Sequence, residues 1–139
     1  MSESTFILQT TLKASGHSMT RPRQVVFEAL HNHEPQTMNR LVTACQQKID
    51  RASVYRTVQL FERLGIVQRL QIGWKYKLEL SDAFSHHHHH LSCSVCGKVI
   101  PIKEDKFLER QLYDLAEAHS FLPESHQLEI RGICEICRT

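Results

Sequence analysis

The chain has 139 residues, of which 41% are hydrophobic, and its formal net charge at pH 7 is +2. This length accommodates one or two small domains, each with a modest core. No apolar run reaches the length of a membrane span, and the first 20 residues lack the basic start and long apolar run of a signal peptide. We therefore expect a cytoplasmic protein with reduced thiols.

The two halves of the chain differ in charge. Residues 1–85 carry 11 Lys and Arg against 7 Asp and Glu, whereas residues 86–139 carry 6 against 8. Metal-bound thiolates would make the second half more negative still. A basic front half and an acidic back half favour a nucleic-acid-binding module joined to a second, different domain.

The first half has the element order of a winged helix-turn-helix. Its sequence predicts helices over residues 4–16, from Thr20–Arg21 onward, from Thr37 onward, and over Ser53–Leu64, which Gly65 ends. Two strands follow, Val67–Gln71 and Trp74–Leu80, joined at Gly73. The second strand predicts an inward set and an outward set of alternating side chains: Trp74, Tyr76, Leu78 and Leu80 inward, and Lys75, Lys77 and Glu79 outward. Residues 81–86 form the expected hinge.

The second half predicts a small sheet with one helix. The expected elements are strands His87–Ser92 and Val99–Ile102, a helix Glu104–His119, and a strand His126–Arg131. Leu128 and Ile130 should face inward, and His119 should be a core residue on the apolar helix face. Such a sheet buries little core alone, so dimerisation through it is expected. The predicted class is α+β, with a winged-helix domain over residues 1–82 and an α/β dimerisation domain over residues 83–139.

Four cysteines form two Cys-x-x-Cys pairs, and these predict a structural zinc site. The pairs are Cys93 with Cys96 and Cys134 with Cys137. Each turn directs two sulfurs at one centre, and Zn²⁺ accepts the tetrahedral four-sulfur shell. Free thiols in unrelated turns and a redox pair are the alternatives, but thioredoxin-like element order is absent. The fifth cysteine, Cys45, is predicted to be a small core residue.

Five consecutive histidines, residues 86–90, precede the first cysteine pair. On a strand, His86, His88 and His90 point to one face, and the two intervening histidines point to the other. One run can therefore supply two metal sites. An engineered tag is the alternative, but the run is internal and a patterned strand follows it. The residues able to complete such sites are His33, Glu79, Glu104, Glu109, His119 and His126.

The helix that begins near Ser53 is a candidate DNA-contacting element. Its N-terminus carries a partial positive charge, and Tyr55 and Arg56 follow at once. Such side chains can reach phosphates and base edges in a major groove. The alternative is an ordinary amphipathic helix with a solvated polar face.

These motifs together resemble one family. The pattern His-His-His-His-His-Leu-x-Cys-x-x-Cys-Gly-Lys-Val-Ile, the upstream Ala-Ser-Val-Tyr-Arg-Thr and the downstream His126…Gly132-x-Cys-x-x-Cys closely resemble the ferric uptake regulator family. The resemblance covers essentially the whole chain. It implies a homodimeric, metal-dependent repressor with a winged helix at the front, binding a palindromic operator in double-stranded DNA.

The resemblance also implies a role for individual residues. The structural zinc site takes Cys93, Cys96, Cys134 and Cys137; the sensory site takes His33, Glu79, His88 and His90; the additional site takes His87, His89, Glu109 and His126. The expected DNA contacts are Lys13 in the minor groove, with Arg21, Ser53, Tyr55, Arg56 and Thr57. The implied metals are Zn²⁺ in the structural site and Fe²⁺, Zn²⁺ or Mn²⁺ in the regulatory sites.

Three departures from the family pattern affect the sensed metal. His89 stands where many relatives have Asp, Pro101 stands where many have an acidic residue, and the loop around residues 31–37 leaves His31 as an alternative to His33. The added nitrogen moves metal preference toward Zn²⁺. Glu79, rather than Asp, is more like the iron sensors. The resemblance thus implies an iron-responsive regulator of metal homeostasis genes, with a zinc-uptake regulator, a peroxide sensor and a zinc-storage protein as alternatives. An enzyme is disfavoured because a four-cysteine site has no open position for catalysis.

Overall fold

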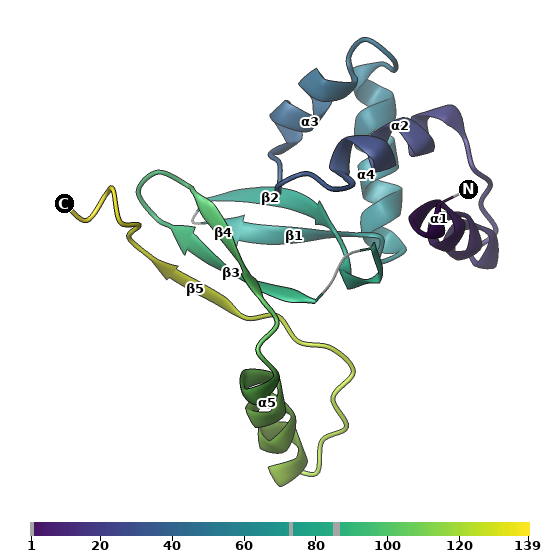
Figure 1. Cartoon of the computed structure of the whole chain (residues 1–139). Coiled ribbons are helices and arrows are strands. Elements are labelled where there is room, and N and C mark those ends of the chain that lie inside the picture. The colour runs from purple at the N-terminus through teal and green to yellow at the C-terminus, as the bar shows by residue number, and fades with distance from the viewer. Residues whose placement is uncertain (1, 73, 85–86) are drawn as a thin grey trace. The chain divides into compact units, whose positions relative to one another are not determined.

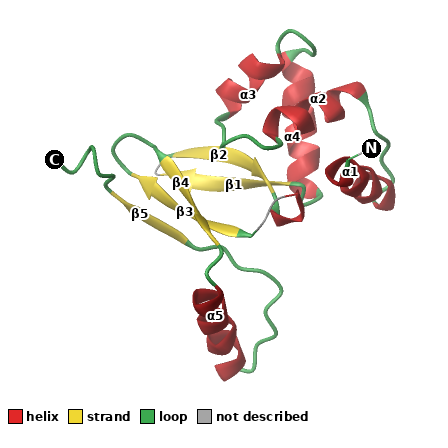
Figure 2. Cartoon of the chain, viewed as in Figure 1, coloured by secondary structure: helices red, strands yellow, loops and turns green. Residues whose placement is uncertain are grey.

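The computed structural model describes residues 2–72, 74–84 and 87–139, and the chain forms two compact units, Met1–Ser85 and His86–Thr139 (Figure 1). The predicted turn residue Gly73, the first histidine of the run, His86, and the end of the predicted hinge lie outside the described residues. Helices and a hairpin make up the first unit, and a sheet with one helix makes up the second (Figure 2). This mixture confirms the predicted α+β class.

The first unit packs its helices around one another and onto a hairpin. Its elements are α1 (Glu3–Ala14), α2 (Arg21–Leu30), α3 (Met38–Cys45), α4 (Arg51–Arg63), β1 (Val67–Ile72), β2 (Lys75–Leu80) and the 3₁₀ helix η1 (Asp82–Phe84). Helices α2, α3 and α4 contact one another, while β1 packs on α4 and β2 on α2. Gln36 extends the hairpin through a backbone bridge, its N–H lying 2.9 Å from the carbonyl oxygen of Leu78. This is the winged-helix arrangement that the element order predicts.

Side-chain caps fix where the helices begin. The Thr20 and Thr37 hydroxyls accept the N–H groups of residues three positions later, at 3.4 and 3.2 Å. The Asp50 carboxylate accepts the Ser53 N–H at 3.1 Å, and these bonds lower the pKa of Asp50. Helix α4 therefore begins at Arg51, two residues before the predicted start. Gly65 ends it with a φ of +74°, as predicted.

The core of the first unit joins all its helices. Phe61 is 0% exposed at its centre, and Cys45 is 1% exposed, which confirms its predicted core position. The alternation expected along β2 is wrong at both ends. Trp74 is 101% exposed because the strand begins only after it. Glu79 is 6% exposed, and its Oε1 accepts a 2.6 Å hydrogen bond from Gln68, its partner across the hairpin.

The second unit is a three-stranded sheet with one helix. Its elements are β3 (His88–Cys93), β4 (Val99–Lys103), α5 (Lys106–Ala118) and β5 (Glu129–Gly132). The strand order is β4-β3-β5, with β4 antiparallel and β5 parallel to the central β3 (Figure 2). The Asp105 carboxylate caps α5 by accepting the N–H groups of Phe107 and Leu108 at 2.9 and 3.3 Å.

Helix α5 leaves its apolar side uncovered. None of its residues is buried, and Phe107, Tyr113 and Leu115 stand among the exposed large hydrophobic side chains. His119 is exposed at the C-cap and Ile130 is 57% exposed, so the expectation that both face a core is wrong within the single chain. The reason is that one short helix and a small sheet have too few partners to bury both of their faces. No described helix is long and apolar enough to cross a membrane.

The packing of Phe61 generates a stability prediction. Phe61→Ala should lower the free energy of unfolding by about 3–5 kcal/mol because it leaves a cavity among buried neighbours. The matched control, Trp74→Ala, should change it by no more than about 0.5 kcal/mol because Trp74 is fully exposed. Urea unfolding followed by far-UV circular dichroism measures both. Equal losses in the two variants would contradict this placement of the core.

Candidate metal centres and nucleic-acid interface

The two cysteine pairs converge at one end of the sheet. The Sγ atoms of Cys93, Cys96, Cys134 and Cys137 all lie within 4.8 Å of one another. The pairing of Cys93 with Gly132 holds the ends of β3 and β5 side by side. After Cys93 the chain turns back through Gly97, whose φ is +77°, so that Cys93 and Cys96 both lie next to the second cysteine pair. Cys96 Sγ lies 3.8 Å from Cys134 Sγ. Two sulfurs on a tetrahedral zinc with 2.3 Å bonds are about 3.8 Å apart, so this donor set fits Zn²⁺.

Hydrogen bonds within the cysteine cluster favour a thiolate at its centre. The N–H groups of Cys96 and Cys134 donate to Cys93 Sγ at 3.5 and 3.3 Å, and they lower the pKa of Cys93 to about 6. Hydrogen bonding to Cys134 raises the pKa of Cys137 to about 12. Four sulfurs this close cannot all ionise unless a cation offsets their charge. The cluster is thus suited to a metal rather than to four free thiols.

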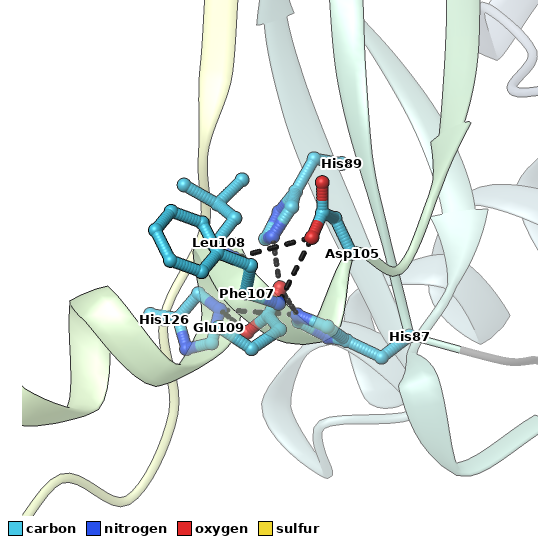
Figure 3. A network of polar contacts seen from close by, with 7 residues as sticks. All are labelled: His87, His89, Asp105, Phe107, Leu108, Glu109 and His126. Atoms are coloured by element: carbon cyan, nitrogen blue, oxygen red, sulfur yellow. Dashed lines mark hydrogen bonds and ion pairs between the residues drawn. The ribbon is translucent and has the colours of Figure 1, made fainter.

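A second group of donors converges on Glu109 (Figure 3). The Nε2 atoms of His89 and His126 lie 2.5 and 2.6 Å from its carboxylate oxygens, and His87 Nε2 lies 3.2 Å from Oε1. Asp105 starts α5 one turn earlier, and the Glu109 N–H donates to the Asp105 carbonyl at 2.9 Å. The helix cap therefore places this carboxylate in the first turn of α5, facing the histidines.

Hydrogen bonds alone do not satisfy the Glu109 group. Each imidazole nitrogen that contacts the carboxylate must donate a proton to it, yet Nε2 of His87 and Nε2 of His126 also lie 3.0 Å from each other. Two donors at this distance repel, whereas two lone pairs directed at one cation do not. All four donor atoms lie within 4.8 Å of one another. The three imidazoles and one carboxylate therefore fit a divalent metal ion such as Zn²⁺ or Fe²⁺.

The protonation of Glu109 agrees with this arrangement. Burial acts to raise the pKa of Glu109, but the hydrogen bond from His89 and the electrostatic influence of the neighbouring His126 and His87 outweigh it, so the pKa is lowered overall. The carboxylate is therefore ionised, which metal binding requires. His89 also has a buried Nδ1 atom that no hydrogen-bond partner meets in the described part of the chain.

The remaining described histidines of the run form a separate pair. The His88 and His90 rings lie 4.6 Å apart, and the His87 and His89 rings lie 4.7 Å apart. Strand alternation thus divides the run into two donor sets, as the period of two predicts. Glu104 and His119, the other candidate ligands, are exposed and join neither donor set among the described residues.

In the first unit, His33 and His31 have different surroundings. His33 is exposed, and its Nδ1 lies 2.8 Å from the carbonyl oxygen of His31. A carbonyl only accepts, so this Nδ1 carries the proton and Nε2 keeps its lone pair for a metal. The His31 ring instead stacks on Phe27, with centroids 5.3 Å apart and planes 16° apart. The local geometry favours His33 as the ligand.

Four of the six candidate DNA-contacting side chains lie in the first two turns of α4. Tyr55 and Arg56 are exposed, and Arg56 Nη2 donates to Ser53 Oγ at 3.2 Å. Lys13 and Arg21 are exposed at the end of α1 and the start of α2, whereas Thr57 is buried. The sequence interpretation overlooked Arg51, which donates to the Tyr55 hydroxyl at 3.2 Å and stacks on its ring. The signal that reveals it is the spacing of four residues on one helix face.

Comparison with known proteins identifies the family. The model of the ferric uptake regulator family matches residues 14–131. The chain belongs to this family. It is 34% identical to the ferric uptake regulation protein of Escherichia coli K12 over 131 residues, which cover 90% of this chain and 86% of that protein.

Solved structures of the family share the fold. The crystal structure of the Vibrio cholerae ferric uptake regulator superposes with a TM-score of 0.72 at 32% identity, covering 91% of this chain and 99% of that chain. The Helicobacter pylori regulator gives a TM-score of 0.78 at 21% identity, covering 98% and 92%. These matches confirm the predicted family and the predicted function of a metal-responsive transcriptional regulator. Members of the family are dimeric DNA-binding regulators.

The cysteine geometry generates a prediction. Cys96→Ser should abolish the zinc bound by the cysteine cluster and unfold or monomerise the second unit. In isolated zinc modules the metal contributes folding free energy of the order of 10 kcal/mol. Zinc analysis, circular dichroism and size-exclusion chromatography check this outcome.

The control for that substitution is the fifth cysteine. Cys45→Ala removes a buried thiol from the first unit and should leave the zinc content unchanged. A Cys96→Ser protein that stays folded, dimeric and fully competent for DNA binding would remove the structural role from this cluster.

Proposed function

We propose that this protein is an iron-responsive repressor that acts in the cytoplasm, binds a palindromic operator as a homodimer, and has no catalytic role. The observation that carries the proposal is that one chain has both features: Tyr55 and Arg56 are exposed near the start of a helix, and histidine and carboxylate side chains converge as possible metal ligands. The similarity to proteins named for ferric uptake regulation supports iron as the sensed metal. Bound Fe²⁺ supplies a charged centre that accepts nitrogen and oxygen ligands together.

The sensory site, in this proposal, takes ligands from both units. His88 and His90 supply two imidazoles from β3, and Glu79 and His33 supply a carboxylate and an imidazole from the first unit. The paired rings of His88 and His90 and the tautomer of His33 support these assignments. Because the ligands belong to separate units, binding favours the arrangement in which all four meet, and so sets the spacing of two recognition helices in a dimer.

Dimerisation is proposed through the second unit. A hollow at the cysteine end of its sheet is lined mainly by the apolar side chains of Leu91, Ile100, Ile130 and Ile133. Cys93, Cys134, Lys98 and Glu135 also line it. The edge strand β5 carries no buried residue, and the apolar side of α5 is uncovered. A second copy of the same surface would bury these groups, as symmetric dimers of small domains do.

A zinc-uptake regulator is the second candidate function. The group around Glu109 contains three imidazoles because His89 replaces the acidic residue that many relatives have, and nitrogen-rich sites favour Zn²⁺ over Fe²⁺. Metal analysis of protein purified without chelator separates the candidates. Iron in addition to the zinc of the cysteine cluster supports the iron sensor, whereas zinc alone supports the zinc regulator.

The proposed sensory site generates a prediction about coupling. The double substitution His88→Ala, His90→Ala should preserve the cysteine-bound zinc, the dimer and basal DNA affinity, but operator affinity should no longer rise with added metal. The reason is that the metal ion then binds no arrangement of the two units more tightly than another. Anaerobic mobility-shift titrations with Fe²⁺, Mn²⁺ and Zn²⁺ measure the response.

The matched control changes the alternate residues of the same strand. His87→Ala, His89→Ala removes ligands that lie wholly in the second unit and should have the smaller effect on the metal response. If the control abolished metal-dependent binding while the first pair left it intact, the sensor would have been assigned to the wrong face of β3.

The start of α4 generates a separate prediction. Arg56→Ala should weaken operator binding by roughly 1–3 kcal/mol if the guanidinium reads a base edge, without changing metal content or dimerisation. Fluorescence anisotropy with operator and scrambled duplexes measures the loss and its sequence dependence. Unchanged binding to both duplexes would exclude this helix from the interface.

A further inference from the structure

A surface hollow in the first unit is lined by cationic and hydroxyl groups. Its walls come from the loop before α2, from the first turn of α2, and from successive turns along one side of α4. The lining residues are His17, Thr20, Pro22, Arg23, Ser53, Arg56, Thr57, Leu60 and Arg63. Three of them are arginines and none is acidic, so the hollow carries a local charge of about +3 with His17 neutral. Such a surface attracts an anion.

Two lining side chains have groups available for a ligand. Thr57 is 5% exposed, yet within the described residues its hydroxyl makes no hydrogen bond. The Arg63 guanidinium likewise has no partner in the described part of the chain. The Thr57 oxygen is not among the fully buried atoms that lack a partner, so it remains accessible from the hollow. Both groups line the hollow, so each can donate to an oxygen of a ligand bound there.

Each of the other two lining arginines, Arg23 and Arg56, makes one hydrogen bond within the first unit. Arg23 Nη1 donates to the Ser18 carbonyl at 2.5 Å, and Arg56 Nη2 donates to Ser53 Oγ at 3.2 Å. These bonds fix the guanidinium planes while leaving further N–H groups of each available. The first turn of α2 contains no acidic residue, so its positive helix end adds to the same field.

We infer that this hollow binds a backbone phosphate of the operator. Arg63 is a contact in addition to those predicted from the sequence, and Thr57, already an expected DNA contact, meets the same phosphate. The inference rests on the proposed role of α4 in DNA recognition. A phosphate offers two non-bridging oxygens, which match the paired N–H donors of a guanidinium and the single donor of a hydroxyl. Such a contact fixes the position of the protein on the duplex and carries no sequence information.

The test measures how DNA affinity depends on salt. Arg63→Gln should weaken binding to operator and scrambled duplexes by the same factor, and the slope of log affinity against log salt should become shallower by about one. Arg63→Lys should restore the slope because it keeps the charge. Thr57→Val, which has nearly the same shape, should weaken both duplexes equally without changing the slope. Arg110→Gln, an exposed arginine of the second unit, is the control and should leave the slope unchanged.

A free anion is the other source of the same chemistry. Thermal unfolding in inorganic phosphate, against chloride of equal ionic strength, detects it. Stabilisation by phosphate that Arg63→Gln removes, with an unchanged DNA slope, would overturn the assignment to DNA. Unchanged DNA binding and unchanged thermal stability in Arg63→Gln and Thr57→Val would also overturn it. If the wild-type protein bound no DNA, the proposed function itself would fail instead. If Arg56→Ala bound both duplexes like the wild type, α4 would lie outside the interface and the premise of this inference would fail.

Discussion

The four-cysteine cluster is the constraint on which the second unit depends. This unit has three short strands and one helix, and no residue of α5 is buried. Its apolar burial is therefore too small to offset the chain entropy of ordering it. The cysteine cluster joins the end of β3 to the segment after β5, so a metal there closes the chain between Cys93 and Cys134. That closure holds β5 beside β3, the strand that carries the histidines.

The histidine run shows how a strand with a period of two supplies two donor sets from one segment. Neighbouring histidines point in opposite directions, and the ring pairs of each face lie 4.6 and 4.7 Å apart. The face that carries His87 and His89 meets a carboxylate within the second unit, at Glu109 on α5. The capping of α5 by Asp105 fixes the position of that carboxylate. A helix cap that is not one of the donors thus positions the carboxylate of a candidate metal site.

Local features were predictable from the sequence, and features set by tertiary packing were not. Each of three features depends on a few neighbouring residues and can be read from the local sequence: the cysteine spacing, the alternation of the histidines, and the threonine caps. The exposure of Trp74 depends instead on where the hairpin turns. The exposure of Ile130 depends on whether α5 covers the sheet. Arg51 escaped notice because the predicted helix started after it. The wrong expectations for Trp74, His119 and Ile130 assumed that an apolar pattern implies a partner within the same chain. The burial of Glu79 depends instead on its hydrogen bond to Gln68 across the hairpin.

The distribution of ligands between the units decides which metal site can regulate. A ligand shifts a conformational equilibrium only if it binds the two states with different affinity. The cysteine cluster and the Glu109 group draw all their ligands from the second unit, so neither discriminates directly between arrangements of the two units. The proposed set of His33, Glu79, His88 and His90 draws on both. In the proposed function, regulation of DNA affinity by metal therefore requires the mixed set, whereas metal in the other two donor sets would act through the stability of the second unit.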